Sequence, residues 1–151
     1  MAGHVKHFTI VTGLVDTNVL VSRFDPRFPD KQSRASTFLR DGIVAGTLAV
    51  PHQALVEFFA VVTRTIAGAP PLLTPDEAHR EVEDMLAQFT VVYPTENTLR
   101  TALRGAALYR LPWFDAHLWA YADERGYDTL WSEDFETGRL YGRVQARNPL
   151  Q

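Results

Sequence analysis

Short runs of consecutive apolar residues along the chain predict buried β-strands. Four of these runs are bounded by glycine, proline or polar residues and contain the β-branched and aromatic side chains that favour extended backbone. In the arginine-containing tail, a last strand is expected at an edge of the sheet. The five predicted strands cover residues 8–15, 47–50, 89–93, 128–131 and 142–147.

Apolar positions at helical spacing, with recognisable start and stop residues, predict helices between these strands. The clearest start is Thr74, which is followed by Pro75 and, three residues after the cap, by Glu77, the pattern of a capping box. Gly126 is an equally clear stop, because glycine readily adopts the left-handed conformation that ends helices. The predicted helices cover residues 31–40, with a stop at Gly42, and residues 53–66, 74–88, 95–109 and 114–125.

The alternation of strands with helices predicts an α/β fold, with a parallel sheet of four to five strands flanked by helices on both faces. The 151 residues fit a single domain that spans residues 1–151. Ligands in such folds bind at the carboxyl ends of the strands. Asp16 follows the first predicted strand and Asp134 lies just past the fourth, so both acids are expected at the same edge of the sheet.

The composition restricts the kind of active site that the protein can have, whereas its net charge does not. The chain has no cysteine, which excludes disulfides and thiolate metal sites and favours a cytoplasmic enzyme with oxygen or nitrogen ligands. The net charge of −3 includes an acidic group at residues 76–84, so it neither supports nor excludes a nucleic-acid partner. The N-terminal segment predicts neither a signal peptide nor a membrane helix.

Four acidic residues occupy positions where a carboxylate needs an explanation. Asp16 follows an apolar strand, and Glu57 is the only ionisable side chain in the apolar helical segment 55–62. Asp115 lies among aromatic residues at a helix start, and Asp134 lies in the loop after a strand. Taken singly, each acid has a structural explanation. Asp16 could cap a helix, and Glu57 could form a buried ion pair. Asp115 could interact with a helix dipole, and Asp134 could be a solvated loop residue.

Taken together, the four acids predict a metal site, because converging carboxylates repel one another unless a cation neutralises them. Oxygen ligands without cysteine indicate Mg²⁺ or Mn²⁺, which could activate a water for phosphodiester cleavage. The sequence contains no phosphate-binding loop, no G-x-G-x-x-G and no H-E-x-x-H. A receiver domain or an aspartyl-phosphate phosphatase would need a lysine late in the chain, and none follows Lys31. The aromatic cluster of Trp113, Phe114 and Trp119 is predicted to pack in the core.

Four segments resemble the motifs of PIN domains in the family's order. Residues 15–20, Val-Asp-Thr-Asn-Val-Leu, resemble the opening motif, and residues 53–59, which contain Glu57, resemble the second. Residues 113–116, Trp-Phe-Asp-Ala, resemble the third motif, and residues 128–135 resemble the closing motif of many VapC-type toxins. The match extends over nearly the whole chain, which makes it specific.

This resemblance implies a PIN-like α/β/α sandwich that acts as a metal-dependent endoribonuclease on single-stranded RNA. It further implies that the protein is the toxin of a type II toxin–antitoxin pair, that it forms a homodimer and that it binds a cognate antitoxin. The implied ligands of Mg²⁺ or Mn²⁺ are Asp16, Glu57, Asp115 and Asp134, supported by the polar residues Thr17, Asn18 and Ser132. The alternative is a catalytically inactive PIN-fold module that binds RNA or protein, and retention of all four acids argues against it.

Overall fold

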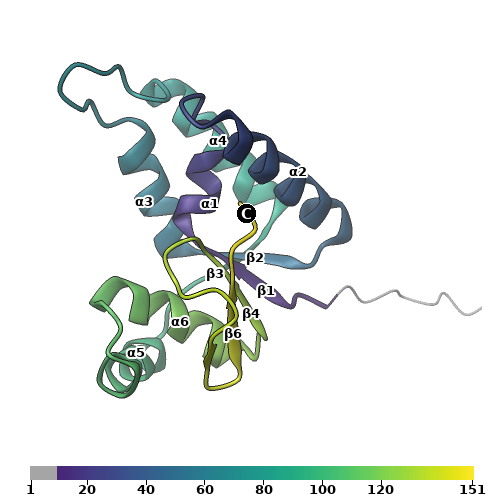
Figure 1. Cartoon of the computed structure of the whole chain (residues 1–151), viewed down its shortest axis with the longest axis vertical. Coiled ribbons are helices and arrows are strands. Elements are labelled where there is room, and N and C mark those ends of the chain that lie inside the picture. The colour runs from purple at the N-terminus through teal and green to yellow at the C-terminus, as the bar shows by residue number, and fades with distance from the viewer. Residues whose placement is uncertain (1–9) are drawn as a thin grey trace, which may run out of the picture.

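The computed structural model of the chain describes residues 10–151 and contains a six-stranded sheet between two layers of helices (Figure 1). The strand order is β3-β2-β1-β4-β6-β5. The strands are β1 (Gly13–Val15), β2 (Leu48–Pro51), β3 (Thr90–Val92), β4 (Thr129–Trp131), β5 (Leu140–Tyr141) and β6 (Val144–Arg147). All pairs are parallel except β5 with β6. The predicted α/β fold with a mostly parallel sheet is therefore confirmed.

Within residues 10–151, six helices cover the two faces of the sheet. They are α1 (Thr17–Ser22), α2 (Pro29–Ala45), α3 (His52–Val62), α4 (Pro75–Gln88), α5 (Glu96–Tyr109) and α6 (Trp113–Arg125). Helices α1 to α4 pack on one face, and α5 and α6 pack on the other, as Figure 1 shows above and below the sheet. Among residues 10–151, no helix has the length and the apolar character needed to cross a membrane.

The strands divide their side chains between two hydrophobic cores. In β1, Leu14 joins the core under α5 and α6, whereas Val15 joins the core under α1 to α4. Ala49 and Val50 in β2 divide in the same way. Because successive side chains of a strand point to opposite faces, each short apolar run serves both cores. This explains why β1 and β2 are apolar throughout instead of alternating.

The predicted start of one helix at Thr74 and the predicted stop of another at Gly126 are both confirmed. Thr74 caps α4 with a complete capping box, in which its hydroxyl accepts from the backbone N–H of Glu77 and the Glu77 carboxylate accepts from the Thr74 N–H. Gly126 ends α6 with a φ of 71°, in the left-handed region. These signals depend on residues within one turn of the helix end, so they can be identified without the tertiary structure.

Two predicted helix ends and the predicted position of the last strand are wrong. Helix α2 does not stop at Gly42 but continues to Ala45, because Gly42 lets the helix lie directly against Leu48 and the left-handed stop is Gly46. Helix α3 ends at Val62, four residues earlier than predicted. The last predicted strand, β6, lies inside the sheet, since the short antiparallel β5 forms the edge.

The first predicted strand is also shorter than residues 8–15. Strand β1 begins at Gly13, and residues 8 and 9 lie outside the described part of the chain.

Gly105→Ala is expected to destabilise the protein, although alanine normally favours a helix interior over glycine by about 1 kcal/mol. A Cβ at Gly105 would overlap the ring of the buried Trp119 where α5 packs on α6. The Trp119 indole cannot move freely because its N–H donates to the Tyr141 carbonyl at 2.9 Å. We expect a loss of about 1–3 kcal/mol in urea unfolding, and a more stable variant would contradict this account.

Candidate active site

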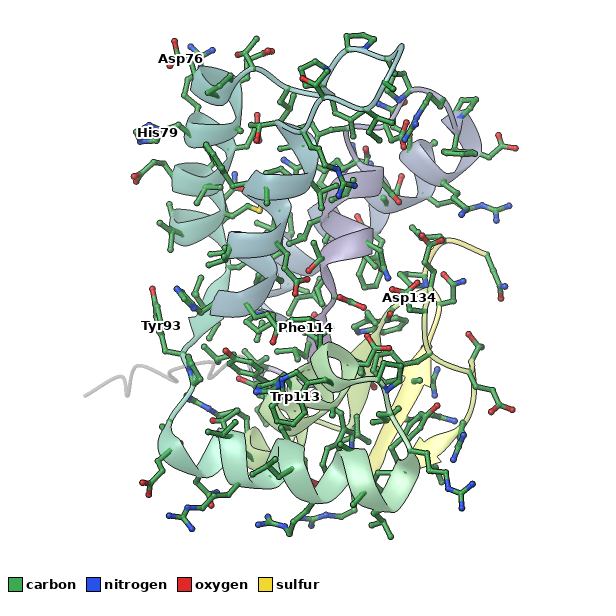
Figure 2. All side chains as sticks on the ribbon, turned by 90° about the vertical axis from the view of Figure 1, so that its left-hand side faces the viewer. Asp76, His79, Tyr93, Trp113, Phe114 and Asp134 are labelled. Carbon is green, nitrogen blue, oxygen red and sulfur yellow. The ribbon has the colours of Figure 1, made fainter. Side chains whose placement is uncertain are left out.

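A cavity of about 340 Å³ opens at the carboxyl ends of β1 and β4, between α1, α3 and α6. The four acids proposed from the sequence all line it: Asp16, Glu57, Asp115 and Asp134. Thr17 and Asn18 also line the cavity, whereas Ser132 lies behind it and contacts Asp16. Figure 2 shows Asp134 on the same face of the molecule as Phe114. The fold thus brings together residues from four separate segments of the chain.

Asp16 is the most deeply buried of these acids, with 3% of its surface exposed. Its backbone N–H donates to the Trp131 carbonyl at 2.9 Å, which extends the pairing of β1 with β4. Its Oδ1 accepts from the Thr17 N–H at 2.6 Å and caps α1, a short helix that the sequence analysis did not predict. Asp16 therefore both caps α1 and lines the cavity.

Ser132 and Asn18 connect Asp16 to the loop that carries Asp134. The Ser132 hydroxyl donates to Asp16 Oδ2 at 2.6 Å and accepts from Asn18 Nδ2 at 3.2 Å and from the Asp134 N–H at 3.1 Å. Asn18 Nδ2 also donates to Asp16 Oδ2 at 3.2 Å. A hydroxyl has one donor and two acceptor positions, so Ser132 uses all of its hydrogen-bonding capacity. This network fixes the loop after β4 relative to α1.

Glu57 is half-buried, not enclosed by apolar residues as the sequence suggested. Val56 and Phe59 on the same helix are exposed, so α3 has an open side. Glu57 Oε2 accepts from the Thr17 hydroxyl at 2.8 Å, and its Oε1 accepts from Gln53 Nε2 at 3.0 Å. The sequence analysis missed Gln53, although its spacing of four residues from Glu57 on a helix was a usable signal.

Lys31 is a second residue that the sequence analysis missed. It lines the cavity, and its Nζ lies 2.8 Å from Glu133 Oε2. No local pattern connects α2 with the loop after β4, so this ion pair is visible only in the folded chain. It also distinguishes Glu133, whose charge is paired, from the neighbouring Asp134.

The aromatic cluster divides in a way that the sequence did not predict. Trp119 is buried, as expected, but Trp113 and Phe114 are exposed. Both lie in the first turn of α6, and Phe114 lines the cavity instead of packing on the sheet. Figure 2 shows these two side chains on the same face as Asp134. The prediction that the whole cluster is core is therefore wrong for these two residues.

The carboxylates of the cavity influence one another through their charges. Burial raises the pKa of Asp16 to about 7; hydrogen bonds from Ser132 and Thr17 act against this rise, and the charges of Asp134 and Asp115 add to it. The pKa of Asp115 is also raised, first by burial and then by the charges of Asp134 and Glu57. The four acids therefore form one electrostatic group.

The donor set suits a hard divalent cation, because it consists of carboxylate oxygens whose mutual repulsion such an ion would offset. Within residues 10–151, however, no three acidic or histidine side chains are placed close enough together to hold one ion. The side chains line a common cavity, and binding one ion would require some of them to turn toward a common point. The chemistry of the residues fits a metal, and the cavity gives it room.

Comparison with known proteins identifies the fold family. The family model described as PIN domain matches residues 13–142. The chain therefore belongs to the PIN domain family, and the resemblance seen in its motifs is confirmed. Among curated protein sequences, none matches the chain significantly.

Solved structures with the same fold include a FitAB complex bound to a DNA fragment, with a TM-score of 0.71 and 17% identity over 92% of this chain and 96% of that one. DNA-bound VapBC from Salmonella typhimurium has a TM-score of 0.65 and 12% identity over 92% of this chain and 98% of that one. VapC20 from Mycobacterium tuberculosis, a toxin that cleaves the sarcin–ricin loop, has a TM-score of 0.61 and 14% identity over 82% of this chain and 89% of that one. At these identities, the likeness concerns the fold.

In the presence of chelator, the protein is expected to lose stability as the pH rises from about 4 to about 7. The carboxyl of Asp16 has a pKa of about 7 in the folded chain, against 3.8 without the fold. Between these values the folded state holds a proton that the unfolded state has released, so raising the pH favours unfolding. Urea unfolding at several pH values should show this loss, on the order of 4 kcal/mol in total.

Asp16→Asn provides the control for this prediction. The asparagine keeps the size of the side chain but has no proton to lose, so the stability of the variant should depend much less on pH in the same window. An equal slope in both proteins would assign the effect to another group.

Proposed function

We propose that this protein is a metal-dependent endoribonuclease that cleaves single-stranded RNA and acts as the toxin of a type II toxin–antitoxin pair. The main support is the cavity lined by Asp16, Glu57, Asp115 and Asp134 in a chain of the PIN domain family. The shared fold with VapC20, itself a toxin that cleaves RNA at the sarcin–ricin loop, favours RNA as the substrate.

We assign the binding of Mg²⁺ or Mn²⁺ to these four carboxylates. When bound, such an ion supplies charge neutralisation at the scissile phosphate and a more acidic water. The surrounding polar residues hold the ligands in place: Ser132, Asn18 and the Thr17 N–H engage both oxygens of Asp16, while Thr17 and Gln53 engage Glu57. These hydrogen bonds hold Asp16 and Glu57 in their orientations before any ion binds.

The proposed partners follow from the same acidic cavity. Its carboxylates create a negative potential when no cation is present, and an arginine from a cognate antitoxin could satisfy them with bidentate hydrogen bonds. The resemblance to VapC-type toxins supports this antitoxin, a homodimer and action in the cytoplasm. An antitoxin arginine in the cavity would compete with the metal for the same oxygens.

RNA cleavage by the purified protein is expected only with added Mg²⁺ or Mn²⁺, and the products should carry 5′-phosphate and 3′-hydroxyl ends. The reason is that the cavity offers four carboxylates that can hold a metal ion and its bound water. Incubation of single-stranded RNA with and without EDTA, followed by analysis of the product ends, tests this. Equal cleavage in EDTA, or cyclic phosphate ends, would refute the metal mechanism. Absence of cleavage in every metal would support an inactive binding module.

Asp134→Asn is expected to reduce the cleavage rate at least about tenfold, which corresponds to roughly 1.4 kcal/mol of transition-state stabilisation. Glu133→Gln is the matched control, because Glu133 also lines the cavity but is paired with Lys31. Its rate should stay near that of the wild type. The reverse order of the two rates would assign the ligand to Glu133.

A further inference from the structure

Two exposed phenylalanine rings line the acidic cavity. Phe28 lies just before α2 and is 53% exposed, and Phe114 lies in the first turn of α6 and is 67% exposed. Helices α2 and α6 cover opposite faces of the sheet (Figure 1), and Phe28 and Phe114 therefore reach the cavity from different layers of the fold. A single exposed phenylalanine is common, but two of them beside one group of carboxylates leave considerable apolar ring surface at a polar site.

The backbone that carries each ring is held by hydrogen bonds. Asp25 accepts from the backbone N–H of Arg27 at 3.1 Å and from its guanidinium at 2.9 and 2.8 Å, which fixes the turn before Phe28. The Phe114 carbonyl accepts a hydrogen bond from Gln53 Nε2 at 3.3 Å, and the same Nε2 also donates to Glu57 Oε1. Both rings are therefore presented on ordered backbone, next to residues that position the acids.

Two basic side chains lie over the Phe28 ring, and each is paired with a carboxylate: Arg27 with Asp25 and Lys31 with Glu133. The Arg27 guanidinium lies 5.7 Å and the Lys31 ammonium 5.5 Å from the centre of the Phe28 ring. Among the residues that line the cavity in the described part of the chain, Lys31 is the only basic one. A base that stacks on this ring would have both cations within reach, and each cation could then bind the adjoining phosphate in place of its carboxylate partner.

We infer that Phe28 and Phe114 are nucleobase-stacking subsites at the acidic cavity. The inference rests on the proposed ribonuclease function, because the phosphate between the two stacked bases would then lie at the carboxylates. Lys31 and Arg27 bind the phosphate on the Phe28 side. Bases in a duplex are already stacked on their neighbours, so two such subsites select single-stranded or unpaired RNA.

The test uses a single-stranded RNA of mixed sequence with 2-aminopurine at a central position, mixed with excess full-length protein in Mg²⁺. Fluorescence is recorded on mixing, before products accumulate, and cleavage is measured separately. Stacking on an aromatic ring should quench the fluorophore. Phe28→Leu and Phe114→Leu keep an apolar side chain but remove the ring, so each should reduce quenching and weaken RNA binding about tenfold.

Tyr93→Leu is the matched control, because Tyr93 is an aromatic residue of similar exposure, 54%, that does not line the cavity. It should bind and quench like the wild type. Normal melting temperatures of the variants exclude misfolding as the cause of any loss.

The outcomes separate this inference from the proposed function. Cleavage and quenching that are the same in the wild type and both phenylalanine variants would overturn the stacking subsites and leave the ribonuclease proposal intact. Quenching that depends on Phe28 and Phe114, without cleavage in any metal, would support the subsites and overturn the ribonuclease proposal. Equal binding and quenching with duplex RNA, or no RNA binding at all, would also overturn the inference.

Discussion

The structure of the site depends on how the buried carboxylate of Asp16 is accommodated. Removing a carboxylate from water is costly, and here hydrogen bonds from the Thr17 N–H, Asn18 and Ser132 offset part of that cost. Those donors come from the start of α1 and the end of β4, so the bonds that solvate Asp16 also fix the relative positions of these segments. The arrangement of the cavity and the local stability of the fold are therefore consequences of the same few interactions.

The parallel sheet explains why residues so far apart in sequence meet at this point. Each crossover returns the chain to the same edge, so β1 and β4 end side by side, and the residues that follow them face one cavity. The helices supply the rest: α3 brings Glu57 from one layer, and α6 brings Asp115 from the other. The acids share one cavity although they are anchored in both layers of the protein.

Much of the fold could be predicted because its signals are local. The cap at Thr74 and the glycine stop at Gly126 act within one helical turn, and the apolar runs mark the strands directly. Features that depend on tertiary contact could not be predicted in this way. Helix α2 continues through Gly42 because of a contact with Leu48, and the exposure of Phe114 depends on where α6 begins relative to the sheet.

The two separate hydrophobic cores affect how the selectivity of the protein can evolve. Asp16 and Glu57 are attached to the layer of α1 to α4, whereas Asp115 and Phe114 are attached to the layer of α5 and α6. A small shift of one layer across the sheet would alter the width of the cavity without replacing any residue that lines it. Conservative substitutions deep in either core could thus adjust the size and shape of the molecules admitted, and the interior would become a source of evolutionary variation in selectivity.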